Sequence, residues 1–213
     1  MVKTFFERVD RLTSNTYIVG KINQNCLIVD LGNNDSSIVE YVKENYNLVE
    51  GILLTHGHYD HIQAVDSFIK EFNYNIPIYI SKFDLELLNN PNLNCSALHN
   101  KKVITNFNPI LIENEKDINL RSFNIKPIFT PYHTSGSICY LLEDENALFT
   151  GDSLFKLSIG RTDLPTSDST KLNKSISKLF KLSKYLTIYP GHGEITNLEY
   201  ELRNNPYLLS IKR

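Results

Sequence analysis

The chain has 213 residues with a formal net charge of −2, and 41% of its residues are hydrophobic and 22% charged, as in ordinary globular proteins. This near-neutral charge gives no electrostatic reason to expect nucleic acid or an anionic membrane as a partner. The sequence contains neither a secretory signal nor an apolar run near the roughly 20 residues that span a bilayer, so we expect a cytoplasmic protein. Because the sequence shows no linker, we also expect a single domain over residues 1–213.

The first half of the chain alternates short strands with amphipathic helices. Strands are expected at Val2–Val9, Thr16–Gly20, Cys26–Asp30 and Gly51–Thr55. Helices are expected at Ser36–Tyr46 and Ile62–Phe72, because apolar residues recur on one face of each. Residues Asn89–Asn108 show no clear period and are expected to form a long irregular connection.

The second half repeats this arrangement. Strands are expected at Phe123–Thr130, Ser137–Leu142, Ala147–Thr150 and Tyr185–Tyr189. A helix is expected at Ser169–Lys184, with its lysines on a solvated outer face.

Metal-type side chains gather directly after four of these strands. They are His56, His58, Asp60, His61, His133, Asp152 and His192. In α/β proteins the loops at the carboxyl ends of strands converge on one edge, where sites form. Seven nitrogen and carboxylate ligands are about what two cations need if each keeps a position open for water.

The spacing within the first cluster suits two ions. His56 and His58 are two residues apart, so in an extended loop they point the same way and can hold one ion together. Asp60 and His61 turn away from that pair as the next helix begins, which suits a second ion.

The later residues can complete both sites. His133 could complete the first site and His192 the second, while the two oxygens of Asp152 could bridge the ions. The lone His99 is assigned no role.

The motif Thr-His-x-His-x-Asp-His, followed in order by the later histidine, Gly-Asp and Gly-His-Gly, resembles the metallo-β-lactamase superfamily. Within it, the chain is similar to the hydroxyacylglutathione hydrolase (glyoxalase II) group. The resemblance implies an α/β fold, a four-layer αββα sandwich. It also implies a first ion on His56, His58 and His133, a second on Asp60, His61 and His192, and a bridging Asp152.

Several positions distinguish the branches of this superfamily. Asp60-His61 argues against class B1 β-lactamases, and His58 argues against flavodiiron proteins. The stretch from Leu154 to Pro165 looks like small, bacterial-type glyoxalase II relatives. Tyr132 replaces the family's usual glycine and is expected beside the first ion. The C-terminal helical domain that grips glutathione in full-length relatives is expected to be missing.

The resulting hypothesis is hydrolysis of a thioester, most simply S-D-lactoylglutathione or a related hydroxyacylglutathione. A water held between two divalent ions would attack as hydroxide. Zinc is the expected metal, and the ligand set also accepts iron or manganese. The expected catalytic residues are Asp60 and Asp152, and Arg161 is expected to anchor an anionic part of the substrate rather than form an ordinary salt bridge. The oligomeric state stays open.

Other readings of the same motif remain. A persulfide dioxygenase would bind a single iron through His56, His133 and Asp152. A lactonase or another acyl hydrolase would use the same two ions on a different substrate. A non-catalytic binding module is disfavoured, because the ligand set is intact.

Overall fold

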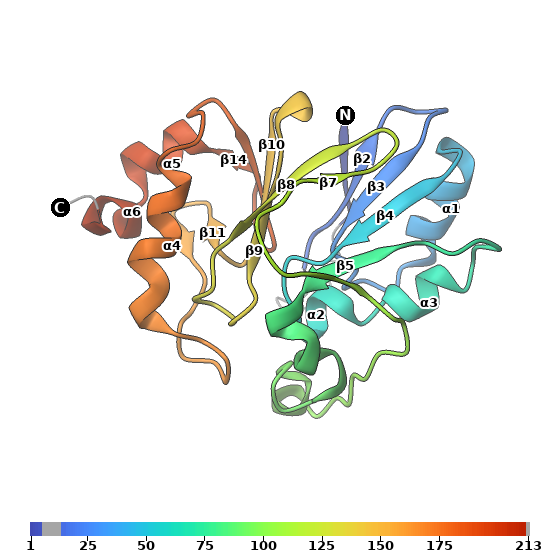
Figure 1. The fold of residues 1–213 in the computed structure, drawn as a ribbon, viewed down its shortest axis with the longest axis horizontal. Coiled ribbons are helices and arrows are strands. Elements are labelled where there is room, and N and C mark those ends of the chain that lie inside the picture. Colours follow the sequence, from blue (N-terminus) through green and yellow to red (C-terminus); the bar gives the residue numbers. More distant parts are fainter. Residues whose placement is uncertain (6–13, 212–213) are drawn as a thin grey trace.

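The computed structural model describes residues 1–5 and 14–211, whose strands form two six-stranded sheets packed face to face (Figure 1). The first sheet has the strand order β1-β2-β3-β4-β5-β6. Its strands are Val2–Phe5, Thr16–Gly20, Cys26–Val29, Val49–Leu53, Ile78–Ser81 and Ile110–Ile112. The first three strands are antiparallel, and β3 to β6 are parallel.

The second sheet has the order β14-β13-β10-β9-β8-β7. From β7 to β14 in chain order, its strands are Ile118–Asn119, Asn124–Phe129, Ile138–Leu142, Ala147–Gly151, Thr187–Pro190 and Thr196–Asn197. A separate two-stranded hairpin consists of β11 (Leu154–Phe155) and β12 (Ser158–Ile159).

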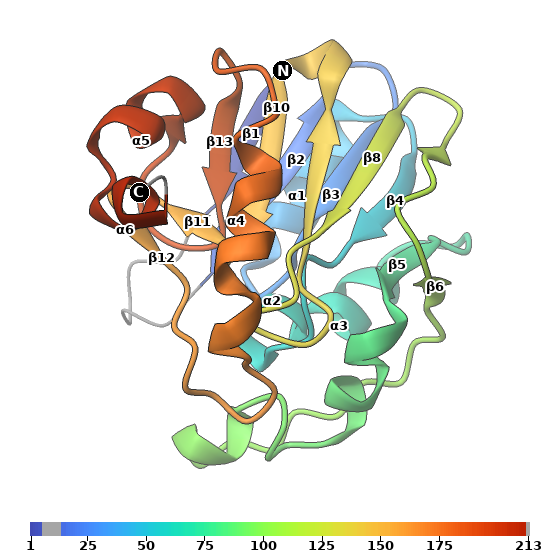
Figure 2. The ribbon, with the colours of Figure 1, turned by 60° about the vertical axis from the view of Figure 1, so that its left-hand side comes forward.

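Helices cover the outer face of each sheet. Beside the first sheet lie α1 (Ser36–Asn45), α2 (Tyr59–Ile62) and α3 (Val65–Ile69). Beside the second sheet lie α4 (Leu172–Leu179), α5 (Leu198–Asn204) and α6 (Pro206–Ile211), with α4 in front of the sheet in Figure 2. The part of the chain that the structure describes also contains the 3-10 turns η1 (Lys82–Asn89), η2 (Ser96–His99), η3 (Glu143–Glu145) and η4 (Ser169–Lys171). The expected αββα sandwich is confirmed.

The residue pattern of the strands explains these layers. In β3, Leu27 and Val29 pack between the two sheets, whereas Cys26 and Ile28 pack under the helices α1 and α3. Side chains alternate between the faces of a strand, so a strand covered on both faces is apolar throughout. This explains why β3 is a continuous apolar run.

The carboxyl ends of β4, β8, β10 and β13 precede the metal-type residues, as expected. In the second sheet β8, β10 and β13 run in one direction, because β9 is antiparallel to both β8 and β10 while β13 is parallel to β10. Near these ends the Tyr140 hydroxyl donates to Leu54 O (2.8 Å) and the Tyr17 hydroxyl donates to Pro190 O (2.6 Å). These bonds join the two sheets where the loops that carry the metal-type residues begin.

The helix expected at Ile62–Phe72 was wrong as one continuous element. The helical segment begins at Tyr59 and is divided into α2 and α3. At the break, Leu31 N donates to His61 O (2.9 Å) and Ala64 N donates to Leu31 O (3.0 Å). These contacts from the loop after β3 replace the helical bonds, and no local pattern reports them.

Other boundaries also differ from the expectations. The helix expected to reach Lys184 ends at Leu179. Of the strand expected at Val2–Val9, residues 6–9 lie outside the described residues. Strands β5 and β6 were not predicted, and the irregular connection Asn89–Asn108 contains the turn η2.

Two properties concern the molecule as a whole. Among residues 1–5 and 14–211, none of the helices has the length and apolar character needed to cross a membrane. Cys26, Cys95 and Cys139 are buried free thiols.

Candidate metal centre

The first group of histidines comes from the loop between β4 and α2 and the loop after β8. His56 Nε2 lies 3.0 Å from His58 Nδ1, and the same nitrogen of His58 lies 3.0 Å from His133 Nε2. All three side chains are buried. Their ring nitrogens converge on one small volume that could hold a metal ion.

These nitrogens cannot all be satisfied by hydrogen bonds to one another. A ring nitrogen is either a donor or an acceptor, so His58 Nδ1 cannot pair fully with both neighbours. Burial, with a contribution from His133, lowers the pKa of His58 to about 3, and burial lowers the pKa of His56 well below its usual value. Both rings are therefore neutral near pH 7, which is the form that binds cations.

The second group joins the start of α2 to the loop after β13. Asp60 Oδ2 lies 3.2 Å from His192 Nε2 and 3.8 Å from His61 Nε2, and the two ring nitrogens lie 3.4 Å apart. Burial raises the pKa of Asp60, but His61 and His192 outweigh burial and lower it. This carboxylate with two imidazoles could hold a second ion.

Asp152 lies between the two groups. Its Oδ2 is 3.4 Å from His133 Nε2 and 3.5 Å from His192 Nε2, and its Oδ1 is 3.4 Å from His61 Nε2. Burial raises its pKa, but His192 and His61 reverse this and hold it well below the usual value. The structure thus brings all seven predicted side chains together, and this donor set fits divalent cations.

The outward-facing nitrogens of three rings have partners of their own. His56 Nδ1 lies 3.1 Å from Thr55 Oγ1, His61 Nδ1 lies 2.8 Å from Asp30 Oδ2, and His133 Nδ1 lies 2.9 Å from Arg161 O. Such partners set the tautomer and orientation of a metal-binding ring. The orientation of all three rings therefore depends on residues outside the ligand set.

Among these outer partners, Asp30 contacts both His61 and Thr55, the partner of His56. Its carboxylate contacts His61 and accepts from Thr55 N (2.8 Å) and Thr55 Oγ1 (2.7 Å). Its φ is 55°, in the left-handed region that aspartate tolerates better than most residues. Asp30 therefore both turns the chain after β3 and orients His61.

Arg161 lines a cavity that opens onto the metal-type residues. Its side chain, 62% exposed, forms two hydrogen bonds with the Asp163 carboxylate, at 2.6 and 2.7 Å. The salt bridge weighed against an anchoring role is thus present. The contact of the Arg161 carbonyl with His133 could not be predicted, because a backbone contact has no residue signature.

The expectation that Tyr132 lies beside the first ion was wrong. Its side chain is fully buried in the core between the second sheet and α4 to α6. Its hydroxyl donates to Ser153 O, and Tyr132 does not line the cavity. The backbone after β8 points His133 and Tyr132 in different directions.

Replacing Tyr132 by phenylalanine should therefore affect stability and not the metal centre. We expect a loss of about 1 kcal/mol in the free energy of unfolding, because the buried Ser153 carbonyl loses its partner. Urea denaturation measures this loss, and metal analysis should find the same metal content as in the unmodified protein. Tyr185→Phe, at an exposed position, is the matched control. A Tyr132→Phe protein that loses metal would contradict this assignment.

The cavity that opens onto the metal-type residues has a volume of about 370 Å³. Its lining includes the apolar side chains Phe155, Ile159 and Leu164 from the region after β10, and Cys95, Leu98 and His99 from the region of η2. His99 packs against the ring of Tyr59 with centroids 5.3 Å apart. These lining residues were not predicted, because they lie in loops whose course depends on tertiary contacts.

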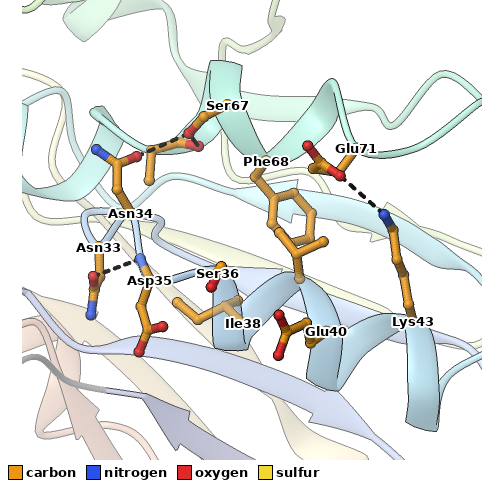
Figure 3. Close-up of a pocket in the computed structure, with 12 residues that line it drawn as sticks. Asn33, Asn34, Asp35, Ser36, Ile38, Glu40, Lys43, Ser67, Phe68 and Glu71 are labelled. Carbon is orange, nitrogen blue, oxygen red and sulfur yellow. Dashed lines mark hydrogen bonds and ion pairs between the residues drawn. The ribbon is translucent and has the colours of Figure 1, made fainter.

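A second cavity lies away from the histidines, between α1 and α3 (Figure 3). Several of its polar groups bind one another. Lys43 Nζ lies 3.1 Å from Glu71 Oε2, and Ser67 Oγ donates to Asn34 Oδ1 at 2.9 Å. The chemistry-bearing side chains are therefore concentrated in the first cavity.

Known proteins match this chain over nearly its whole length. The family model described as the metallo-β-lactamase superfamily matches residues 9–192. A Bacillus subtilis protein, "Probable metallo-hydrolase YqgX", is 35% identical over 202 residues, covering 94% of each chain. The "Hydroxyacylglutathione hydrolase GloC" of Haemophilus influenzae is 30% identical over 219 residues, covering 95% of this chain and 96% of the relative.

The solved structure of the "BLEG-1 B3 metallo-beta-lactamase" superposes with a TM-score of 0.90 at 34% identity, covering 98% of this chain and 99% of that one. Its fold and the extent of the family match agree with the αββα layers and the clustered histidines. The chain therefore belongs to the metallo-β-lactamase superfamily.

Proposed function

We propose that the protein is a metallohydrolase that uses two divalent ions, zinc in the first instance, to cleave a thioester such as S-D-lactoylglutathione. The position of Asp152 carries this proposal, because one carboxylate lies within 3.5 Å of ring nitrogens from both groups. A shared carboxylate of this kind is typical of paired metal ions. The similarity to a hydroxyacylglutathione hydrolase supports the choice of substrate.

The protein's own residues prepare the site for this reaction. A bound pair of divalent ions supplies a nucleophile from water near neutral pH and polarises the carbonyl under attack. His56, His58 and His133 would hold one ion, and Asp60, His61 and His192 the other. Asp30 and the other outer partners keep the rings aimed inward, so little reorganisation is needed when substrate binds.

The leaving group suits a site of this composition. A thiol has a pKa of about 8.5, so a thiolate departs without a strong general acid. The apolar side chains of Phe155, Ile159 and Leu164 can receive the uncharged part of a thioester. Arg161, which lines the same cavity, offers a cation for a carboxylate of the thiol carrier. To bind that carboxylate, its guanidinium must leave Asp163.

Replacing Arg161 by alanine is expected to raise KM about two- to fivefold and to leave kcat nearly unchanged. The effect is modest because exposed ion pairs contribute about 1 kcal/mol or less, and Asp163 already competes for the guanidinium. Steady-state kinetics with S-D-lactoylglutathione measures it. Arg203→Ala is the control, since Arg203 forms a similar exposed pair with Glu199 and does not line the cavity. An unchanged KM would assign Arg161 to the salt bridge alone.

The dioxygenase reading uses side chains of the same cluster. Asp152 Oδ2 lies 3.4 Å from His133 Nε2, and His56 shares a candidate metal group with each of these two residues, which would bind the single iron together with it. Metal analysis of the purified protein tests the choice. About two ions per chain supports the hydrolase, whereas one iron per chain with oxygen consumption on a persulfide would overturn it.

β-Lactam hydrolysis is a second candidate function, favoured by the likeness to the BLEG-1 structure. The same ions and the same cavity would serve it, since a lactam carbonyl is attacked in the same way. A chromogenic cephalosporin assayed beside the thioester, and a lactone as a third substrate, decide which acyl group the cavity prefers.

A further inference from the structure

A carboxylate outside the predicted site joins the two loops that carry the first histidine group. Asp84 lies in η1 and is 0% exposed. Its Oδ2 accepts from Gly57 N (2.9 Å) and Thr134 Oγ1 (2.7 Å), and its Oδ1 accepts from Gly136 N (2.6 Å). With a longer bond from Ser135 Oγ (3.5 Å), one side chain thus accepts four hydrogen bonds from two separate loops.

The donors to Asp84 are sequence neighbours of the histidines of the first group. Gly57 lies between His56 and His58, and Thr134 directly follows His133. The first loop leaves β4 of the first sheet, and the second leaves β8 of the other sheet. Asp84 therefore connects the two sheets at the point where the nitrogens of His58 and His133 approach to 3.0 Å.

The close approach also accounts for the two glycines. A Cβ on Gly136 would lie 2.6 Å from Asp84 Cγ, and a Cβ on Gly57 would lie 2.7 Å from Leu87 Cβ in the same 3-10 turn. Both distances are too short for real side chains. Each loop must therefore present bare backbone to η1 for Asp84 to reach its amides.

Burial gives Asp84 a strong dependence on both loops. A buried carboxylate is costly unless donors satisfy it, and each buried amide that loses its acceptor adds a similar cost. Burial raises the pKa of Asp84, while the bonds from Thr134 and Gly57 lower it. The arrangement is stable only when the two loops stand at the separation that Asp84 spans.

We propose that Asp84 is a positioning residue that sets the distance between His58 and His133 and thereby the affinity of the first ion. This inference rests on the proposed function only in assuming that His56, His58 and His133 hold a cation. The residue touches neither that ion nor substrate. It acts on the positions of His58 and His133 through its hydrogen bonds to the backbone and side chain of the neighbouring residues Gly57 and Thr134.

The test compares metal binding by Asp84→Asn and Glu50→Gln. Glu50 is a matched control, because it is a buried carboxylate that accepts from Ser122 N (2.9 Å), Ser122 Oγ (2.6 Å) and Asn25 Nδ2 (2.5 Å). It lies in β4 at the end remote from the histidines. Both variants lose stability, measured by thermal unfolding of the metal-free proteins.

Zinc affinity is measured by competition with a chromogenic chelator, which resolves the binding of the two ions into two steps. His58→Ala should lose one of these steps, and the lost step is assigned to the ion of the first group. Asp84→Asn should weaken that step about 10- to 100-fold, the usual effect of removing a residue that orients ligands. The other step, and both steps in Glu50→Gln, should match the unmodified protein. With cobalt in place of zinc, the visible spectrum of Asp84→Asn should also change.

Unchanged affinity for the first ion in Asp84→Asn would overturn the inference. If that protein does not fold, Thr134→Val, which removes one of the donors, decides in its place: a weaker first step supports the inference and an unchanged one refutes it. If the unmodified protein binds both ions but leaves thioesters intact, the proposed function fails while the positioning role of Asp84 is still measured.

Discussion

Asp152→Asn is expected to lower kcat/KM for thioester hydrolysis by more than about a hundredfold. The change removes the negative charge that faces His133, His61 and His192, and it places an amide where a carboxylate oxygen now lies. Loss of residues that only orient ligands already costs about 10- to 100-fold, so loss of a shared ligand should cost more. Steady-state kinetics and metal analysis of the same preparation measure both consequences.

The control for this substitution is Asp144→Asn. Asp144 is exposed in η3, just before β10, the strand that ends at the site. Its replacement should leave both activity and metal content as they are. Substantial activity in a metal-loaded Asp152→Asn protein would contradict a role for Asp152 between two ions.

Asp30→Asn is expected to lower the affinity for the ion of the second group about 10- to 100-fold. It should also lower the free energy of unfolding by about 1–3 kcal/mol. An amide cannot accept from Thr55 N and Thr55 Oγ1 while also accepting from His61 Nδ1, so one buried donor loses its partner. Asparagine tolerates the positive φ of this position, so the backbone turn itself is preserved.

Chelator competition and urea denaturation measure the two effects of Asp30→Asn. Asp35→Asn is the control, because Asp35 caps α1 through Ser37 N at 2.8 Å and asparagine caps helices equally well. A variant with weakened stability but unchanged metal affinity would show that Asp30 supports the fold without orienting His61.

The layers were predicted by the resemblance to the family, and the order of the elements was predicted better than their boundaries. Strands such as Thr16–Gly20 were found because they are apolar runs between polar turns, and the order of strands and helices follows from such runs. The division of one expected helix into α2 and α3 could not be foreseen, since it depends on backbone bonds from Leu31. Strand β6 is apolar but only three residues long, too short to show the period of a strand, and two of its three side chains are exposed.

The same division applies to the candidate site. The histidines and aspartates were recognisable because metal-type residues at these spacings carry a chemical signature, and the structure brings them to one cavity. Two of the groups that orient them were not recognisable. Asp84 and the Arg161 carbonyl act through the backbone of distant loops, and the direction of the Tyr132 side chain is decided by core packing.

The most direct test of the account is the rate of S-D-lactoylglutathione hydrolysis by the purified, zinc-loaded protein. We predict efficient turnover in proportion to occupancy, falling when a chelator removes the metal and returning when zinc is restored. Negligible turnover by protein shown to carry two ions per chain would contradict the thioesterase assignment and leave another acyl substrate to be found.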